Sequence, residues 1–224
     1  MMNKLAPAAL ALAAVAGGAW WYAGQTGTPQ GTPVASAEAQ GNDLELDLDR
    51  VPDMALGDAD APIEVIEYAS LTCPHCANFH ENTLPQIKEN YIDPGHVRFV
   101  HREVYFDRYG LWAAMLARCG GSESRYFGLL DLIYEEQGDW ATHSDPADAA
   151  EALRAIGRQA GLSNDRLDEC FGDADQAQAM VAAYEHYADL HDVTATPTFV
   201  INGEKFSNMS YSDFADVLDA RLDD

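Results

Sequence analysis

The chain has 224 residues, of which 47% are hydrophobic, so it can bury a core as one domain of ordinary size or as a small domain with a large insertion. Acidic residues outnumber basic ones 37 to 13. Nucleic acid and anionic membrane surfaces repel a polyanion, so the composition argues against both as partners. We interpret the acidity chiefly as a source of solubility.

The N-terminus has the pattern of a targeting segment. Lys4 is the only charged residue before Glu38, and residues 5–23 form an uncharged, apolar run that ends in aromatic residues. Residues 1–23 are therefore predicted to be either a secretory signal cleaved after a small-residue site at 35–37, or an uncleaved membrane anchor. The long stretch before that site slightly favours the anchor. Both interpretations place the rest of the chain outside the cytoplasm.

The next segment, residues 24–42, is rich in Gly, Thr, Pro, Ala and Gln, and is predicted to be a flexible linker. Order is expected to begin near Leu44, where leucines alternate with acidic residues as in a half-buried strand. The elements expected next are a strand over 63–69, a helix over 74–91 that Pro85 should kink, and a strand over 97–100. This strand–helix–strand order predicts an α/β fold with a parallel sheet.

A helical insertion is expected to interrupt the sheet. The predicted helices cover 111–118, 125–137, 146–160, 166–171 and 175–190. The sheet pattern resumes with a strand over 198–201, an Asn202-Gly203 hairpin turn and a return strand at 205–206, and a helix over 211–222 ends the chain. We therefore expect one domain from 43–103 and 193–224, with 104–192 as an inserted helical domain.

Chemistry is concentrated in the motif Cys73-Pro74-His75-Cys76. Cys73 should lie between a strand and a helix, with Pro74 in the first helical turn, where its missing N–H is harmless. A thiolate there would face free backbone N–H groups and the positive end of the helix dipole, and a protonated His75 would add a cation. These effects should lower the pKa of Cys73 and make the disulfide with Cys76 easily reduced. Cys76, one turn further on, fits the resolving cysteine.

A Cys-x-x-Cys pair can also be a structural disulfide or half of a zinc site. A zinc site needs four ligands, and the sequence holds no second Cys-x-x-Cys. Even with the nearby His80, Cys73 and Cys76 would still need a fourth ligand. We therefore expect a redox pair and no metal, and keep a Cys/His metal-binding module as the least favoured alternative.

Residues 67–76 and 196–203, with a helical region between them, resemble the DsbA family of bacterial periplasmic disulfide oxidases. The resemblance covers the chain from about Ala55 to its end and implies a thioredoxin fold with a helical insertion and no cofactor. It implies donation of the Cys73–Cys76 disulfide to reduced, unfolded substrate proteins in the periplasm. A membrane oxidase similar to DsbB would then regenerate the disulfide, and we expect a monomer.

The resemblance also assigns roles to residues outside the motif. Pro197 matches the family's cis-proline, so Thr196 and Pro197 are expected to bind substrate opposite the active disulfide. Threonine before that proline is commoner among disulfide isomerases, which keeps a reductase or isomerase as the alternative activity. Glu67 matches a buried acid to which the family ascribes proton exchange with the buried thiol. Its strand face, shared with Ile63 and Val65, predicts the same burial.

Cys119 and Cys170 both fall in the expected insertion. Because an exported chain with an even number of cysteines favours disulfides, we predict a structural bond between them. Some alphaproteobacterial members of the resembled family carry such a second bond. Two free buried thiols are the alternative.

Overall fold

The computed structural model describes residues 46–223, and every structural statement below refers to that part of the chain. The predictions of a signal or anchor over 1–23 and a linker over 24–42 lie outside the described residues. The domain boundaries at 43–103, 104–192 and 193–224 remain predictions.

Five strands form one mixed sheet in the order β1-β3-β2-β4-β5. The strands are β1 (Met54–Leu56), β2 (Ile63–Ala69), β3 (Val97–Glu103), β4 (Thr198–Ile201) and β5 (Glu204–Ser207). β2 and β3 are parallel, because a helical crossover joins them, and the other neighbours are antiparallel. The predicted fold, a thioredoxin fold with a helical insertion, is confirmed.

The predicted strand beginning near Leu44 is wrong where the structure describes it. Residues 48–50 form a turn instead. The Asp47 carboxylate accepts a hydrogen bond from the backbone N–H of Arg50 at 3.1 Å, and the Leu48 carbonyl accepts one from the backbone N–H of Val51 at 3.1 Å. Aspartate readily offers the backbone this local hydrogen bond, and here that bond prevails over the alternation of leucines.

The predicted helix over 74–91 is a continuous helical segment with two widened turns. Its parts are α2 (Pro74–Asn78), the π-helical turn η1 (Phe79–Thr83), α3 (Leu84–Ile87) and a second π-helical turn η2 (Lys88–Ile92). In η1 the N–H of Leu84 bonds to the carbonyl of Phe79, five residues back. Pro85 follows at once, and its missing N–H and bulky ring exclude a regular α-helical bond there. Where a kink was predicted at Pro85, the structure has a widened turn just before this residue.

Six helices separate β3 from β4, and α10 (Tyr211–Leu222) ends the chain. They are α4 (Arg108–Arg118), α5 (Glu123–Glu135), α6 (Gln137–Trp140), α7 (Pro146–Gln159), α8 (Asn164–Gly172) and α9 (Ala174–Leu190). The helix predicted over 125–137 is two helices, α5 and α6, because Glu136 leaves helical geometry. Side chains that accept a backbone N–H cap five of the six, namely Asp107, Ser122, Asp145, Ser163 and Asp173.

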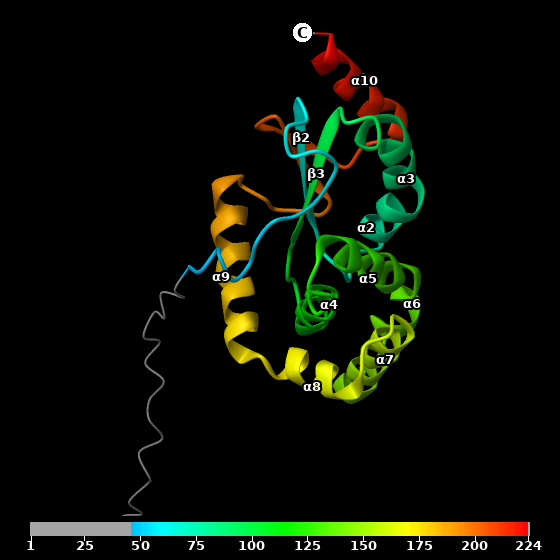
Figure 1. Ribbon diagram of the computed structural model, residues 1–224, viewed down its shortest axis with the longest axis vertical. Helices are drawn as coiled ribbons and strands as arrows, with labels where there is room; N and C mark the ends of the chain where they lie inside the picture. Colours follow the sequence, from blue (N-terminus) through cyan, green and yellow to red (C-terminus); the bar gives the residue numbers. More distant parts are fainter. Residues whose placement is uncertain (1–45, 224) are drawn as a thin grey trace, which may run out of the picture. The chain divides into compact units, whose positions relative to one another are not determined.

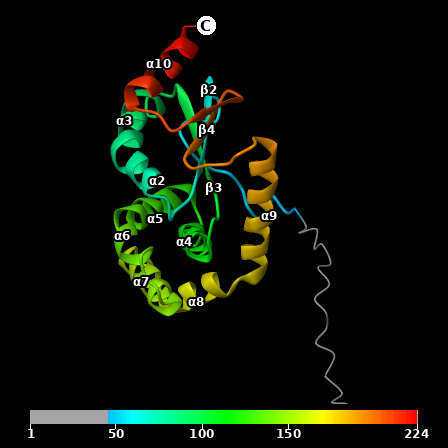
Figure 2. The same cartoon turned by 180° about the vertical axis from the view of Figure 1, so that it is seen from behind.

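Helices cover both faces of the sheet. The segment from α2 to η2 and the C-terminal α10 lie on one face, and α9 lies on the other (Figure 1; the reverse view is Figure 2). The first face buries aromatic residues from both layers, including Phe79, Phe99, Phe199 and Phe214. Helices α4 to α8 lie beside the C-terminal ends of β2 and β3, where the chain enters α2 and α4 (Figure 1). The end of β2 therefore meets the insertion, and this is where the Cys-x-x-Cys motif begins.

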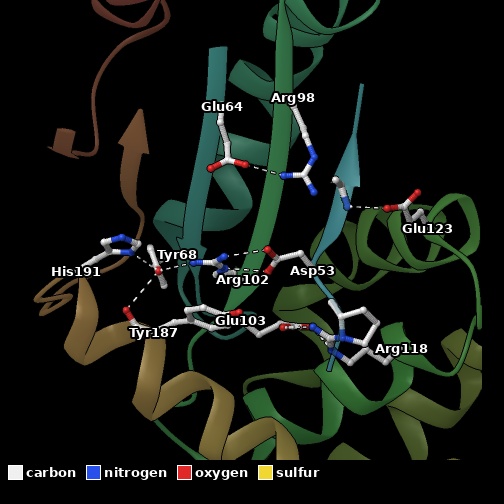
Figure 3. Close-up of polar contacts among 12 residues, drawn as sticks. Asp53, Glu64, Tyr68, Arg98, Arg102, Glu103, Arg118, Glu123, Tyr187 and His191 are labelled. Atoms are coloured by element: carbon white, nitrogen blue, oxygen red, sulfur yellow. Dashed lines mark hydrogen bonds and ion pairs between the residues drawn. The ribbon is translucent and has the colours of Figure 1, made fainter. Parts of the chain in front are cut away.

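Arg102 on β3 ties α9 to the sheet (Figure 3). Its guanidinium donates two hydrogen bonds to Asp53 at 2.9 and 2.8 Å and one to the Tyr68 hydroxyl at 3.0 Å. The same guanidinium lies 3.7 Å from the ring centroid of Tyr187 on α9, and Tyr68 also bonds to His191 at the end of that helix. This partly buried network fixes α9 against the face of the sheet opposite the motif's helix.

Candidate active site

Cys73 caps the helical segment that follows β2. Its backbone is extended, and its carbonyl accepts the N–H groups of Cys76 and Ala77 at 3.1 and 3.2 Å. Pro74 occupies the first helical turn, and both Pro74 and His75 are exposed, whereas Cys76 is fully buried. Both cysteines are free thiols here. The motif thus presents one partly exposed sulfur at the start of a helix and hides the other.

The surroundings of Cys73 favour its thiolate. Hydrogen bonding from the Cys76 thiol, with further bonds from Thr196 and from the backbone N–H groups of Cys76 and His75, lowers the pKa of Cys73 to about 5 against the opposing effect of burial. The thiolate therefore outnumbers the thiol by roughly a hundred to one at pH 7.

Cys76 has the opposite character. Burial raises the pKa of its thiol far above the ordinary value, and the hydrogen bond to Cys73 and the negative charge of Glu67 raise it further. Two cysteines three residues apart therefore differ sharply in acidity. The exposed sulfur is the stable anion and good leaving group, and the buried one binds a proton whenever the disulfide opens.

The loop that leads into β4 faces the reactive sulfur. The carbonyl oxygen of Thr196 lies 3.5 Å from the Sγ of Cys73, and the peptide bond between Thr196 and Pro197 is cis. Pro197 is buried and leads directly into β4, while Thr196 is half-buried. The structure therefore brings Thr196 and Pro197, which are more than 120 residues away in sequence, to the Cys73 sulfur.

Gln137 fastens the loop that carries Cys73, and sequence reasoning did not single it out. Its Nε2 donates to the carbonyl of Leu71 at 2.7 Å and to the carbonyl of Cys73 at 3.1 Å, and its side chain is buried. Gln137 opens α6 in the insertion, where one amide among helix formers gives no periodic or motif signal. The insertion thus contributes directly to the geometry of the active-site loop.

Glu67 is fully buried, as its strand face predicts. Its Oε2 lies 2.7 Å from Nε2 of His80, a residue of η1 that is also buried. The strand register places Glu67 beside His101 on β3, which is buried as well. The burial of His101 was missed, although the alternation of Val97, Phe99 and His101 places it on the apolar face of its strand.

The side chains of Glu67, His80 and His101 lie close together, with one polar atom of each within 4.8 Å of the others, and a hydrogen bond joins Glu67 to His80. The 2.7 Å contact between Glu67 and His80 is shorter than the spacing of about 3.3 Å that two ligands adopt on one tetrahedral zinc ion. The geometry is that of a hydrogen bond, and the expectation that the protein uses no metal remains a prediction.

Cys119 and Cys170 are joined by a disulfide that links the end of α4 to α8 across a sequence separation of 51. Both residues line a surface pocket of about 400 Å³, together with Arg50, Arg118 and Arg166. The bond lies among the helices of the insertion and is separate from the Cys73–Cys76 pair.

Comparisons with known proteins agree with this geometry. A family described as Thioredoxin matches residues 49–220. The crystal structure of alpha-DsbA1 from Wolbachia pipientis is 33% identical, with a TM-score of 0.71, over 75% of this chain and 89% of that one. A Rickettsia bellii protein assigned as a protein-disulfide oxidoreductase is 30% identical over 172 residues, which are 77% of this chain. BdbD from Bacillus subtilis, at 20% identity and a TM-score of 0.68 over 80% of this chain and 96% of that one, shares the fold.

The chain therefore belongs to the thioredoxin family. Within that family it is DsbA-like, as the similarity to alpha-DsbA1 over 89% of that chain shows. It spans only 65% of the length of the Rickettsia bellii relative and 61–63% of four others from the same genus.

Proposed function

We propose that this protein oxidises thiols in exported substrate proteins by donating its Cys73–Cys76 disulfide. The observation that carries the proposal is the contrast between the two sulfurs, a half-exposed Cys73 with a pKa of about 5 and a buried Cys76 with a raised pKa. A stable Cys73 thiolate favours the reduced enzyme, and this makes its disulfide a strong oxidant.

The reaction follows from these properties. A substrate thiolate attacks Sγ of Cys73, so that a substrate–Cys73 disulfide forms while the Cys73–Cys76 bond breaks. Cys76 leaves with the electron pair and takes up a proton, for which Glu67 is the proposed donor. A second substrate thiolate then attacks the substrate sulfur and releases Cys73 as its stable thiolate. Two substrate thiols are thereby oxidised to a disulfide and the enzyme disulfide is reduced to a dithiol.

Thr196 and Pro197 are the proposed substrate-binding residues, because the Thr196 carbonyl lies beside the sulfur that is attacked. An extended substrate could align its backbone with this loop. His75 and Pro74 are exposed next to Cys73 and are proposed to tune its reactivity. The Cys119–Cys170 bond is proposed to be structural.

We place this activity in the periplasm, with reduced, unfolded proteins as substrates and a DsbB-like membrane oxidase as the partner that restores the disulfide. Residues 5–23 would export the chain or anchor it. Within residues 46–223, none of the helices combines the length and the apolar character needed to cross a membrane.

The test is a single-turnover reaction of the oxidised protein with a reduced, unfolded protein. We expect stoichiometric disulfide transfer, no transfer by Cys73→Ser, and trapped mixed disulfides with Cys76→Ser. Failure of the wild-type protein to transfer its disulfide would refute the proposal.

The alternative expected from Thr196, a reductase or isomerase, does not fit the relatives that this chain resembles, which are DsbA-type proteins and a protein-disulfide oxidoreductase. Trapping the thiols in cells checks the proposed oxidase, which should hold Cys73 and Cys76 mainly oxidised.

A further inference from the structure

The proton needed by Cys76 requires a route through the protein, because the thiol is completely buried. Glu67 is close enough for its charge to raise the pKa of Cys76, yet Glu67 is itself completely buried. A carboxyl group with no access to water can supply one proton and then needs another group to restore it.

His101 does not serve that purpose, because its protonation state is fixed. The Tyr126 hydroxyl donates to Glu103 Oε1 at 2.9 Å, and Arg118 holds Glu103 through two further hydrogen bonds at 2.7 and 2.8 Å. Tyr126 has then no hydrogen left for His101, so His101 Nδ1 must donate to Tyr126 at 2.7 Å. Burial lowers the pKa of His101 to about 3, so the ring stays neutral at physiological pH.

His80 is the remaining group, and it lies between Glu67 and the surface. One ring nitrogen, Nε2, lies 2.7 Å from Glu67, while Nδ1 has no partner within the described residues. The side chain is only 2% exposed, but it helps to line a surface pocket of about 500 Å³ whose other lining residues include the carboxylates of Glu81, Asp131 and Glu135. His80 thus contacts the buried carboxyl on one side and borders an acidic pocket on the other.

The groups around His80 come from each element packed on it. Glu67 faces it from β2, His101 from β3, and Tyr134 and Asp131 from α5, with the Tyr134 ring centroid 4.4 Å away. Of these, His101 stays neutral, and burial raises the pKa of Tyr134 well above its ordinary value, so neither exchanges protons near pH 7.

We propose that His80 is a positioning residue that holds Glu67 and passes protons between it and the acidic pocket whenever Cys76 gains or loses one. This inference rests on the proposed oxidase function. When the Cys73–Cys76 bond breaks, the Cys76 thiolate takes the proton of Glu67, Glu67 takes one from His80, and His80 takes one from water in the pocket. Reoxidation runs the same transfers in reverse.

The test is the pH dependence of disulfide transfer in His80→Gln. Glutamine can still donate a hydrogen bond to Glu67 but cannot carry a proton. We expect the single-turnover rate to fall on the order of tenfold at pH 7 and to lose part of its dependence on pH between 5 and 8. The equilibrium constant for exchange with glutathione and the acid dissociation constant of Cys73 should each change less than twofold. His96→Gln, at an exposed histidine, is the matched control and should behave as the wild type.

A second variant separates proton transfer from packing. His80→Ala opens the position to the pocket, so added imidazole should restore the rate in proportion to its concentration, whereas no such rescue is expected for a residue that only packs. A His80→Gln rate equal to the wild type at every pH would overturn the inference. The inference would also be overturned if freshly purified reduced protein contained one zinc or copper ion per chain and His80→Gln removed that ion. A wild-type protein that transfers no disulfide would overturn the proposed function itself.

Discussion

The carbonyl oxygen of Thr196 lies 3.5 Å from the sulfur of Cys73, although 123 residues separate the two along the chain. The contact joins the loop before β4 to the start of α2, and the side chain of the same Thr196 is among the groups that lower the pKa of the reactive thiol. The properties of Cys73 therefore depend on groups from distant parts of the sequence as well as on its own motif.

The acidity of Cys73 should depend most on the thiol of Cys76. In reduced protein, thiolate absorbance near 240 nm should titrate with a midpoint of about 5. Cys76→Ala removes the donor with the largest effect and should raise the pKa of Cys73 by about one unit or more. Cys76→Ser retains a donor and should raise it less. Midpoints equal to that of the wild type in both variants would show that the side chain at 76 does not control this thiolate.

The stability of the reduced protein should depend on pH through Cys73. Its pKa is lower in the folded state than in the unfolded chain, so the thiolate stabilises the fold fully above the unfolded pKa of about 9. That contribution declines as pH falls and is lost near pH 5. Denaturant unfolding of reduced wild type and Cys73→Ala should show a difference in the free energy of unfolding that shrinks between pH 9 and pH 5. A constant difference across this range would contradict the prediction.

Removing the amide of Gln137 should loosen the active-site loop. Gln137→Ala leaves the carbonyls of Leu71 and Cys73 without their donor, and we expect a loss of about 1–3 kcal/mol in the free energy of unfolding. Gln159→Ala, at an exposed glutamine in α7, should change stability by less than about 0.5 kcal/mol. Equal effects of the two substitutions would rule out a specific role for Gln137.

The Cys119–Cys170 bond should stabilise the fold without taking part in disulfide transfer. A loop of about 51 residues closed by a disulfide gives an entropic stabilisation of about 4 kcal/mol, and measured effects are commonly about 2–4 kcal/mol. The double variant Cys119→Ala/Cys170→Ala should unfold at lower denaturant concentration and keep its single-turnover rate within about twofold. A large loss of rate in protein that is still folded would indicate a role in the reaction.

The parts of the fold that depend on local patterns could be predicted from the sequence. Strand β2, the crossover helix after Cys73, and α10 follow from hydrophobic periodicity and from Pro74 in a first helical turn. The turn at Leu48 could not be predicted, because the Asp47 side chain competes with the strand pattern through a hydrogen bond that alternation does not reveal.

The active site divides in the same way. The motif fixes Cys73 and Cys76, and the alternation along β2 indicates that Glu67 is buried. The partners of these residues could not be predicted in this way. His80 contacts Glu67 only when the helical segment packs on β2, and Gln137 contacts the loop only when α6, 64 residues beyond Cys73, packs against it. Such contacts arise from tertiary structure and leave no spacing in the sequence that would reveal them.

The two hydrogen bonds from Gln137 imply that the inserted helices cannot be exchanged freely between related proteins. A chimera that received a foreign insertion would keep the cysteine motif and the sheet, yet its reactive loop would lack the brace that now restrains it. Designers who graft such segments, and natural recombination alike, would have to preserve a donor at that place or rebuild the loop around its loss.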